Sequence, residues 1–218
     1  GIAVVRPKKL FKRLLGFVLS EPSLFAAMNK HHHFILYKPY GYLSQFVNNK
    51  TRKKKLLGSL FDFPEGTMAV GRLDAKSEGL LLLTTDGKLS DAICSQKVEK
   101  EYYVQVDGLI SSEALENLKN GVEIGFEGKR YRTKPCQVQF LKEIPDFHVR
   151  SKKIRDDRHG PTSWVSMVLT EGKFRQVRKM TAAVGYPTLR LIRVRIGNIF
   201  LDPLVLGQVA PFDITQCL

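Results

Sequence analysis

Apolar and polar residues alternate along several stretches of this chain, in the period-two pattern of half-buried β-strands. The clearest case is residues 100–108, where Tyr102, Val104 and Val106 fall on one face. Continuous apolar runs bounded by glycine and turn residues predict strands that are buried on both faces. By these two criteria we expect strands at residues 34–37, 68–70, 80–83, 100–108, 137–140, 164–170, 188–196 and 200–206.

A second periodicity, of three to four residues, predicts a small number of short helices. Val177, Met180 and Val184 recur at helical spacing, while Arg175 and Arg178 lie one turn apart on another face. Further helices are expected after a cap at Ser111 or Ser112 and at residues 89–95. Strands outnumber helices and come in hairpin-like pairs. The expected fold is therefore α+β, with a large mixed, mostly antiparallel central sheet and flanking helices.

The first 30 residues differ in composition from the rest of the chain. Residues 1–30 are basic and poor in acidic residues, and we interpret them as a flexible extension or a misassigned start that precedes Met28. An organellar targeting segment is the alternative. We expect residues 31–218 to form the folded domain, with subdomains of about 31–98 and 99–218.

A long polar stretch interrupts the pattern of strands at residues 142–161. It shows no periodicity, and five basic residues lie between Arg150 and Arg158. Loops of this length within a compact domain are usually functional or disordered. We expect this loop to become ordered on a polyanion.

Charge narrows the class of partner. The formal net charge is +14, from 35 Lys and Arg against 21 Asp and Glu, which favours nucleic acid over a membrane or an acidic small molecule. No apolar run approaches the roughly 20 residues of a membrane span.

The three cysteines, Cys94, Cys136 and Cys217, are far apart in sequence and indicate a reducing compartment, so we expect a cytoplasmic location. The histidine run 31–33 has no spaced partner, and we expect no metal.

The loop between the apolar runs 68–70 and 80–83 is the strongest candidate for chemistry. It carries Arg72 and Asp74 beside glycine, on the rigid support of two buried strands. A lone aspartate in a turn is most often only a turn former. Pattern and charge alone leave both interpretations of Asp74 open.

Basic and aromatic residues gather in the C-terminal half of the chain. Between residues 172 and 195 there are seven basic residues and no acidic one, which is consistent with a surface that follows phosphates. Tyr102 could stack on an unstacked base, although its strand face also carries two valines and a core position is the alternative. There is no P-loop, dinucleotide fingerprint, zinc spacing or Cys–His pair. Covalent catalysis by an aspartate is therefore a reasonable chemistry for an enzyme built this way.

Three ordered motifs resemble those of one enzyme family. GRLDAKSEGLLLLTTDG is similar to the catalytic motif of the RsuA-type pseudouridine synthases, KEYYVQVDG to their second motif, and EGKFRQVRKM with LRLIRVRIG to their third. The resemblance extends from about residue 34 to residue 206. No S4 RNA-binding module is recognisable before residue 34. The segments KPYGYLSQF, PTSW and PTLRLIR are most similar to members that act on large-subunit (23S) ribosomal RNA.

The resemblance implies a pseudouridine synthase fold with a basic cleft and a role for each matching residue. Asp74 would be the nucleophile, attacking C1′ of the ribose or C6 of the uracil; Tyr102 would stack on the flipped base; and Arg178 would pair with Asp74. Leu191 or Ile192 would form an apolar wall of the base pocket. RNA contacts would come from Arg72, Lys100, Lys173, Arg175, Lys179, Arg190 and Arg193. The resemblance implies no cofactor and no metal.

Three positions depart from the usual pattern of the family. Ser77 stands where threonine is common, Phe174 where asparagine is common and Lys179 where arginine is common, which affects substrate detail more than chemistry. The expected protein is a monomeric isomerase acting on a uridine of large-subunit ribosomal RNA. The alternatives are a synthase acting on tRNA or small-subunit RNA, and a non-catalytic RNA-binding assembly factor.

Overall fold

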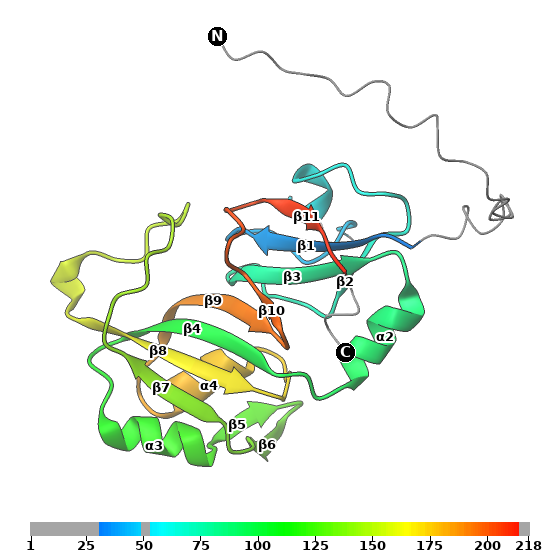
Figure 1. Cartoon of the computed structure of the whole chain (residues 1–218). Helices are drawn as coiled ribbons and strands as arrows, with labels where there is room; N and C mark the ends of the chain where they lie inside the picture. The colour runs from blue at the N-terminus through cyan, green and yellow to red at the C-terminus, as the bar shows by residue number, and fades with distance from the viewer. Residues whose placement is uncertain (1–30, 49–52, 214–218) are drawn as a thin grey trace, which may run out of the picture. The chain divides into compact units, whose positions relative to one another are not determined.

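The computed structural model describes residues 31–48 and 53–213, and residues from His31 onward belong to one compact unit. Its main sheet contains the strands β1 (His33–Lys38), β2 (Met68–Val70), β3 (Glu78–Thr84), β4 (Lys100–Asp107), β7 (Gln137–Leu141), β8 (Thr162–Leu169), β9 (Thr188–Ile196), β10 (Ile199–Phe200) and β11 (Val209–Pro211). The strand order is β11-β1-β3-β9-β4-β8-β7, with β2 beside β3 and β10 beside β9 (Figure 1). The extension expected at residues 1–30 lies outside the described residues.

The sheet is mixed and mostly antiparallel, which confirms the predicted α+β class. Only β3 and β9 pair in parallel, with Glu78 opposite Ile192 and Gly79 opposite Arg193, among the strand pairs of the described residues. This pair carries the sheet without a break from residues 31–98 into residues 99–218. Gly79 has a φ of +111°, and a Cβ there would lie 2.3 Å from the carbonyl oxygen of Arg193. Only glycine allows the two strands to come this close.

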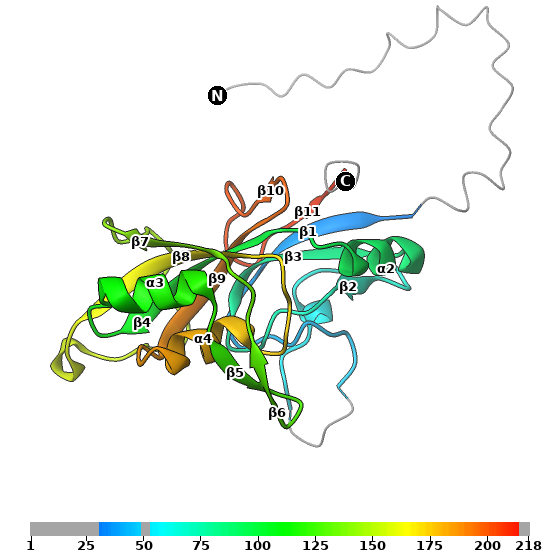
Figure 2. The same ribbon diagram turned by 90° about the horizontal axis from the view of Figure 1, so that it is seen from below.

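The helices of the described residues are α2 (Gly87–Ser95), α3 (Ser112–Asn120) and α4 (Gln176–Ala183), with single 3-10 turns η1 (Leu57–Ser59) and η2 (Asp157–His159). A separate hairpin consists of β5 (Glu123–Phe126) and β6 (Lys129–Arg132). Figure 2 shows α3, α4 and this hairpin on one side of the sheet. None of the helices within the described ranges is long and apolar enough to cross a membrane.

Local sequence explains where the first two helices begin. Asp86 caps α2, because its carboxylate accepts hydrogen bonds from the backbone N–H groups of Lys88 and Leu89. Ser111 caps α3 in the same way and accepts from Ala114 N. Helix α4 differs, since Arg175 stands at its N-cap position in the left-handed conformation (φ 53°) and forms no side-chain cap.

The core follows the predicted alternation. All seven residues of β3 are buried, as expected for an apolar strand covered on both faces. On β4, Val104 and Val106 are fully buried against α3 and α4, whereas Tyr103 packs on the opposite face with Trp164. The loop that carries Asp74 therefore enters and leaves the sheet through rigid strands.

Two segments differ from expectation, and the expected ordering of residues 142–161 on a polyanion stays a prediction. The strand predicted at residues 200–206 is wrong: β10 ends at Phe200, and the edge strand beside β1 is β11. The β5–β6 hairpin was not predicted, because its charged KRYR strand carries little apolar alternation. Residues 142–161 pack on the domain through side-chain contacts, which include Arg150 over the ring of Tyr40 at 4.5 Å.

Candidate active site

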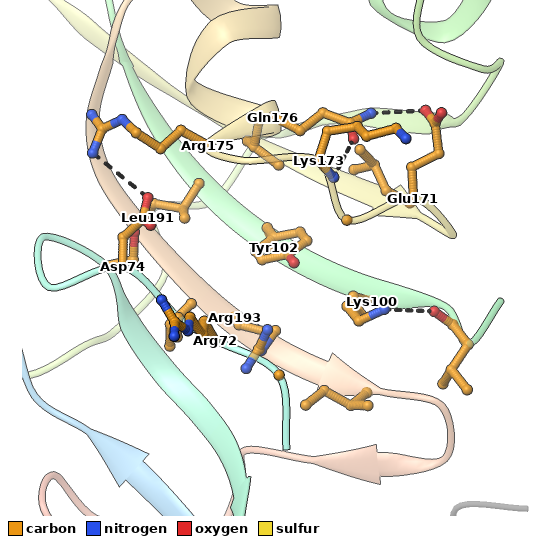
Figure 3. Close-up of a pocket in the computed structure, with 18 of the residues that line it drawn as sticks. Arg72, Asp74, Lys100, Tyr102, Glu171, Lys173, Arg175, Gln176, Leu191 and Arg193 are labelled. Atoms are coloured by element: carbon orange, nitrogen blue, oxygen red, sulfur yellow. Dashed lines mark hydrogen bonds and ion pairs between the residues drawn. The ribbon is translucent and has the colours of Figure 1, made fainter. Parts of the chain in front are cut away.

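A cavity of about 280 Å³ opens between the β2–β3 loop, β4, β9 and the segment before α4 (Figure 3). This volume is near the lower end of the roughly 300–1,000 Å³ typical of small-ligand sites. Its charged lining residues are Arg72, Asp74, Lys100, Glu171, Lys173, Arg175, Arg178 and Arg193. Six cations thus surround two carboxylates, and the predicted basic cleft is confirmed.

Asp74 is fixed by the backbone on both sides of it. Ser44 Oγ donates to the carbonyl oxygen of Leu73 (2.7 Å) and accepts from Leu73 N (3.0 Å). On the other side, Gly41 N donates to Ala75 O at 2.6 Å. The side chain of Asp74 remains 28% exposed and lines the cavity. The turn therefore holds a carboxylate in a fixed position that a ligand can reach.

The cation paired with Asp74 is Arg175. Its Nη1 lies 3.6 Å from Asp74 Oδ2. The expected pair with Arg178 is wrong in this structure, because α4 begins only at Gln176, so Arg175 lies in the turn before the helix and not on its face. A non-glycine residue in the left-handed region costs of order 1–3 kcal/mol, and such strain is often found at functional sites.

Arg178 supports the loop of Asp74 from behind. Its Nη2 donates to Lys76 O (2.8 Å) and Ser77 Oγ (3.1 Å). Burial and the nearby charge of Arg175 lower the pKa of Arg178, while the negative charge of Asp74 opposes this shift. The hydroxyl that Ser77 retains in place of threonine is thus used to hold this guanidinium.

Tyr102 and Leu191 form the aromatic and apolar walls of the cavity. Both line it, and Tyr102 also packs on the core beside Val104. Leu191 is the wall residue that the resemblance left open. Ile192 is completely buried on the opposite face of β9, because successive side chains of a strand point in opposite directions.

The expected RNA-binding residues on β9 are not at the surface. Arg190 is 6% exposed, and its Nε and Nη2 donate to Glu78 Oε2 (2.9 Å) and Oε1 (2.8 Å). The expectation that Arg190 binds RNA is therefore wrong in this structure, because β9 is a central strand and its side chains are covered. Arg193 is 3% exposed but lines the cavity.

The other predicted RNA-binding cations lie at the cavity or beside it. Arg72 is exposed, and Lys100 Nζ donates to Val98 O at 3.2 Å. Burial, followed by the charge of Arg193, lowers the pKa of Lys100.

Two further lysines contact the β5–β6 hairpin. Lys173 Nζ lies 4.9 Å from the ring centre of Phe126, and Lys179 Nζ donates to Gly125 O at 2.7 Å. Of the two, only Lys173 lines the cavity. The predicted contact between Lys179 and RNA stays a prediction.

Glu171 is a site residue that the sequence did not reveal. Its carboxylate accepts hydrogen bonds from Tyr131 Oη, Lys134 N (2.9 Å) and Gln176 Nε2 (2.8 Å). Burial opposes ionisation of Glu171, but these hydrogen bonds outweigh it and lower its pKa. Glu171 thereby joins the β5–β6 hairpin to the segment that carries Arg175. Its partners are distant in sequence and leave no local signal.

The described residues contain no group of three His, Cys, Asp or Glu side chains that could hold a metal ion. The cavity offers a carboxylate, an aromatic ring and an apolar wall among cations. Such a set can bind a planar, unstacked ring and attack an electrophilic carbon covalently.

Comparison with known proteins agrees with this chemistry. Residues 32–183 match the family model described as RNA pseudouridylate synthase. The chain is 44% identical to ribosomal large subunit pseudouridine synthase E of Xanthomonas axonopodis pv. citri (strain 306) over 172 residues, 78% of this chain and 88% of that protein. It is 40% identical to the protein of the same name from Vibrio parahaemolyticus serotype O3:K6 (strain RIMD 2210633), covering 80% of this chain and 71% of that one.

A solved crystal structure of a pseudouridylate synthase superimposes with a TM-score of 0.68 at 27% identity, covering 87% of this chain and 74% of that chain. The family match covers the loop of Asp74, the strand of Tyr102 and helix α4, all of which contribute residues to the cavity. This chain therefore belongs to the RNA pseudouridylate synthase family.

Proposed function

We propose that this protein isomerises a uridine of large-subunit ribosomal RNA to pseudouridine, with Asp74 as the nucleophile. The observation that carries the proposal is the fixed carboxylate of Asp74 in a cationic cavity that also contains Tyr102. The names of the relatives at 44% and 40% identity support the large subunit as the substrate. We expect a monomer acting in the cytoplasm, and the free thiols of Cys94 and Cys136 are compatible with a reducing compartment.

The target uridine must leave its RNA helix to reach the cavity. Extrusion costs a few kcal/mol, which the cationic lining offsets by attracting phosphates. The base would stack on Tyr102 and contact Leu191. Asp74 would then attack C1′ or C6, and Tyr102 could assist removal of the proton from C5 after the base has rejoined the ribose through that carbon.

The surrounding cations would have separate roles. Arg175 would hold the carboxylate of Asp74 in place through their 3.6 Å contact. Arg178 would hold the loop of Asp74 through Lys76 and Ser77. Arg72, on the exposed side of the same loop, would contact phosphates of the RNA.

The direct test is pseudouridine mapping with purified protein on separate transcripts of 23S rRNA, 16S rRNA and tRNA. The wild type should modify one site in 23S rRNA. Asp74→Asn should lower the rate by about 10⁴-fold or more, the scale observed when other catalytic groups are removed. Asp91→Asn, which changes an exposed carboxylate on α2, is the matched control.

Each outcome of this test has a clear meaning. An active Asp74→Asn variant would exclude Asp74 as the nucleophile. Modification of only 16S rRNA or tRNA would refute the choice of substrate. Binding of rRNA by the wild type without any pseudouridine would indicate a non-catalytic assembly factor.

A further inference from the structure

Arg193 is a buried cation that has no anionic partner among the described residues. It is 3% exposed, and its Nε donates to the backbone oxygen of Leu80 at 2.8 Å. Its Nη2 is buried and has no hydrogen-bond partner among the described residues. No carboxylate of the described ranges forms an ion pair with it, whereas Arg190, three residues earlier, has Glu78. Buried charges in proteins are normally paired, so Arg193 requires an explanation.

The nearby charges make its situation less favourable. Burial lowers the pKa of Lys100, and the positive charge of Arg193 lowers it further. Burial also lowers the pKa of Lys38 to about 7, where Glu78 opposes the shift and Arg193 adds to it. Lys100 and Arg193 both line the cavity, and their like charges act on each other there. Such a site has a positive potential that a ligand carrying negative charge would relieve.

The position of Arg193 limits what that ligand can be. Arg193 lies directly across from Tyr102 in the pairing of β9 with β4, and both line the cavity. Figure 3 shows Arg193 on the strand next to that of Tyr102. A base stacked on Tyr102 would bring its edge towards Arg193. RNA phosphates are more easily met by Arg72, which is exposed and lines the same cavity.

We propose that Arg193 stabilises the negative charge that develops on the carbonyl oxygens of the uracil during the reaction; this rests on the proposed function. If Asp74 attacks C1′, an oxygen–carbon bond forms, the C1′–N1 bond breaks, and its electron pair leaves with the base, spread over O2 and O4. If Asp74 attacks C6, an oxygen–carbon bond forms and the C5–C6 π electrons move to C5 and O4. Either route transfers one negative charge from Asp74 to the pyrimidine.

A guanidinium fixed in advance is suited to this purpose. Donors that are already oriented towards developing charge need no reorganisation during the reaction, and they act more strongly in a site that excludes water. The Nε bond to Leu80 fixes the orientation of Arg193, and its Nη2 has no hydrogen-bond partner among the described residues. Arg193 would thus be a catalytic residue and not a phosphate contact.

Kinetics provide the first test. Arg193→Gln should lower kcat by about 10²–10³-fold, the usual loss for one such donor, with a smaller change in KM. Arg193→Lys should retain more activity, because it keeps the charge. The matched control, Arg72→Gln, should mainly raise KM. A raised KM with unchanged kcat in Arg193→Gln would overturn the proposal.

A spectroscopic test does not depend on turnover. RNA carrying 5-bromouridine at the target position reports ionisation of the base at N3 by its absorbance, and the resulting anion also places charge on O2 and O4. In the Asp74→Asn protein, binding should lower the pKa of this base relative to free RNA. Adding Arg193→Gln should remove most of the shift, whereas adding Arg72→Gln should retain it.

The two tests separate the possible failures. An unshifted base pKa in bound Asp74→Asn would overturn the role of Arg193 even if Arg193→Gln did not fold. Equal shifts with and without Arg193 would do the same. Absence of pseudouridine formation by the wild type would refute the proposed function instead. Thermal unfolding of each variant identifies losses of activity that come from misfolding.

Discussion

Removing one partner of the buried pair between Glu78 and Arg190 should destabilise the protein strongly. The side chains of Glu78 and Arg190 are 1% and 7% exposed, and two hydrogen bonds of 2.9 and 2.8 Å join them. In Glu78→Gln the guanidinium stays charged, because arginine does not lose its proton in proteins. A buried charge left without its partner costs about 3–5 kcal/mol. For a domain of this size the melting temperature should fall by roughly 6–20 °C.

The double variant distinguishes this reasoning from simple loss of packing. Arg190→Met removes the charge and keeps an apolar side chain, so Glu78→Gln/Arg190→Met should be more stable than the sum of the single changes implies. Chemical denaturation of the four proteins measures the coupling, which should exceed about 1 kcal/mol for groups in direct contact. Strict additivity, or a loss below about 1 kcal/mol in Glu78→Gln, would refute the argument.

Two further predictions concern the loop of Asp74 and the long loop beyond β7. Arg175→Gln should lower kcat for pseudouridine formation by more than tenfold and leave the melting temperature unchanged. Arg178→Gln should lower both kcat and the melting temperature, because Arg178 supports the loop. Equal effects of the two variants on kcat and on the melting temperature would contradict these separate roles. Burial lowers the pKa of His148, with Glu78 opposing the shift, so the unfolded state binds a proton first as pH falls. Stability should therefore be complete above about pH 6.5 and decline as pH falls through the lower folded-state pKa, and His148→Gln, measured by denaturant titration across this range, should show a smaller decline.

Local patterns were sufficient to predict most strands and helices. The alternation around Val104 and the cap at Ser111 each depend on neighbouring residues, and the structure reproduces both. The prediction of a strand at 200–206 was wrong because an apolar run does not by itself supply a neighbouring strand with which to pair. The true edge strand, β11, is only three residues long.

The sequence predicted which residues form the candidate site better than it predicted which of them contact one another. Asp74 and Tyr102 line one cavity, as the motifs implied, and of the two candidates for the apolar wall only Leu191 lines it. The partner of Asp74 depended on whether α4 begins before or after Arg175, a difference of a single residue that periodicity cannot resolve. The burial of Arg190 depended on Glu78, which is 112 positions away in sequence.

The short parallel pair between β3 and β9 has a consequence for the order of folding. Hairpins such as β5–β6 close between neighbouring residues, but the bond from Arg193 to Leu80 spans 113 positions. Pairings over such separations carry the largest loop-closure cost and tend to form late and slowly. Asp74 and Tyr102 can line one cavity only after β3 and β9 have paired. Recovery of activity during refolding should therefore lag behind recovery of helical signal, and enzymatic competence would report completion of the native sheet.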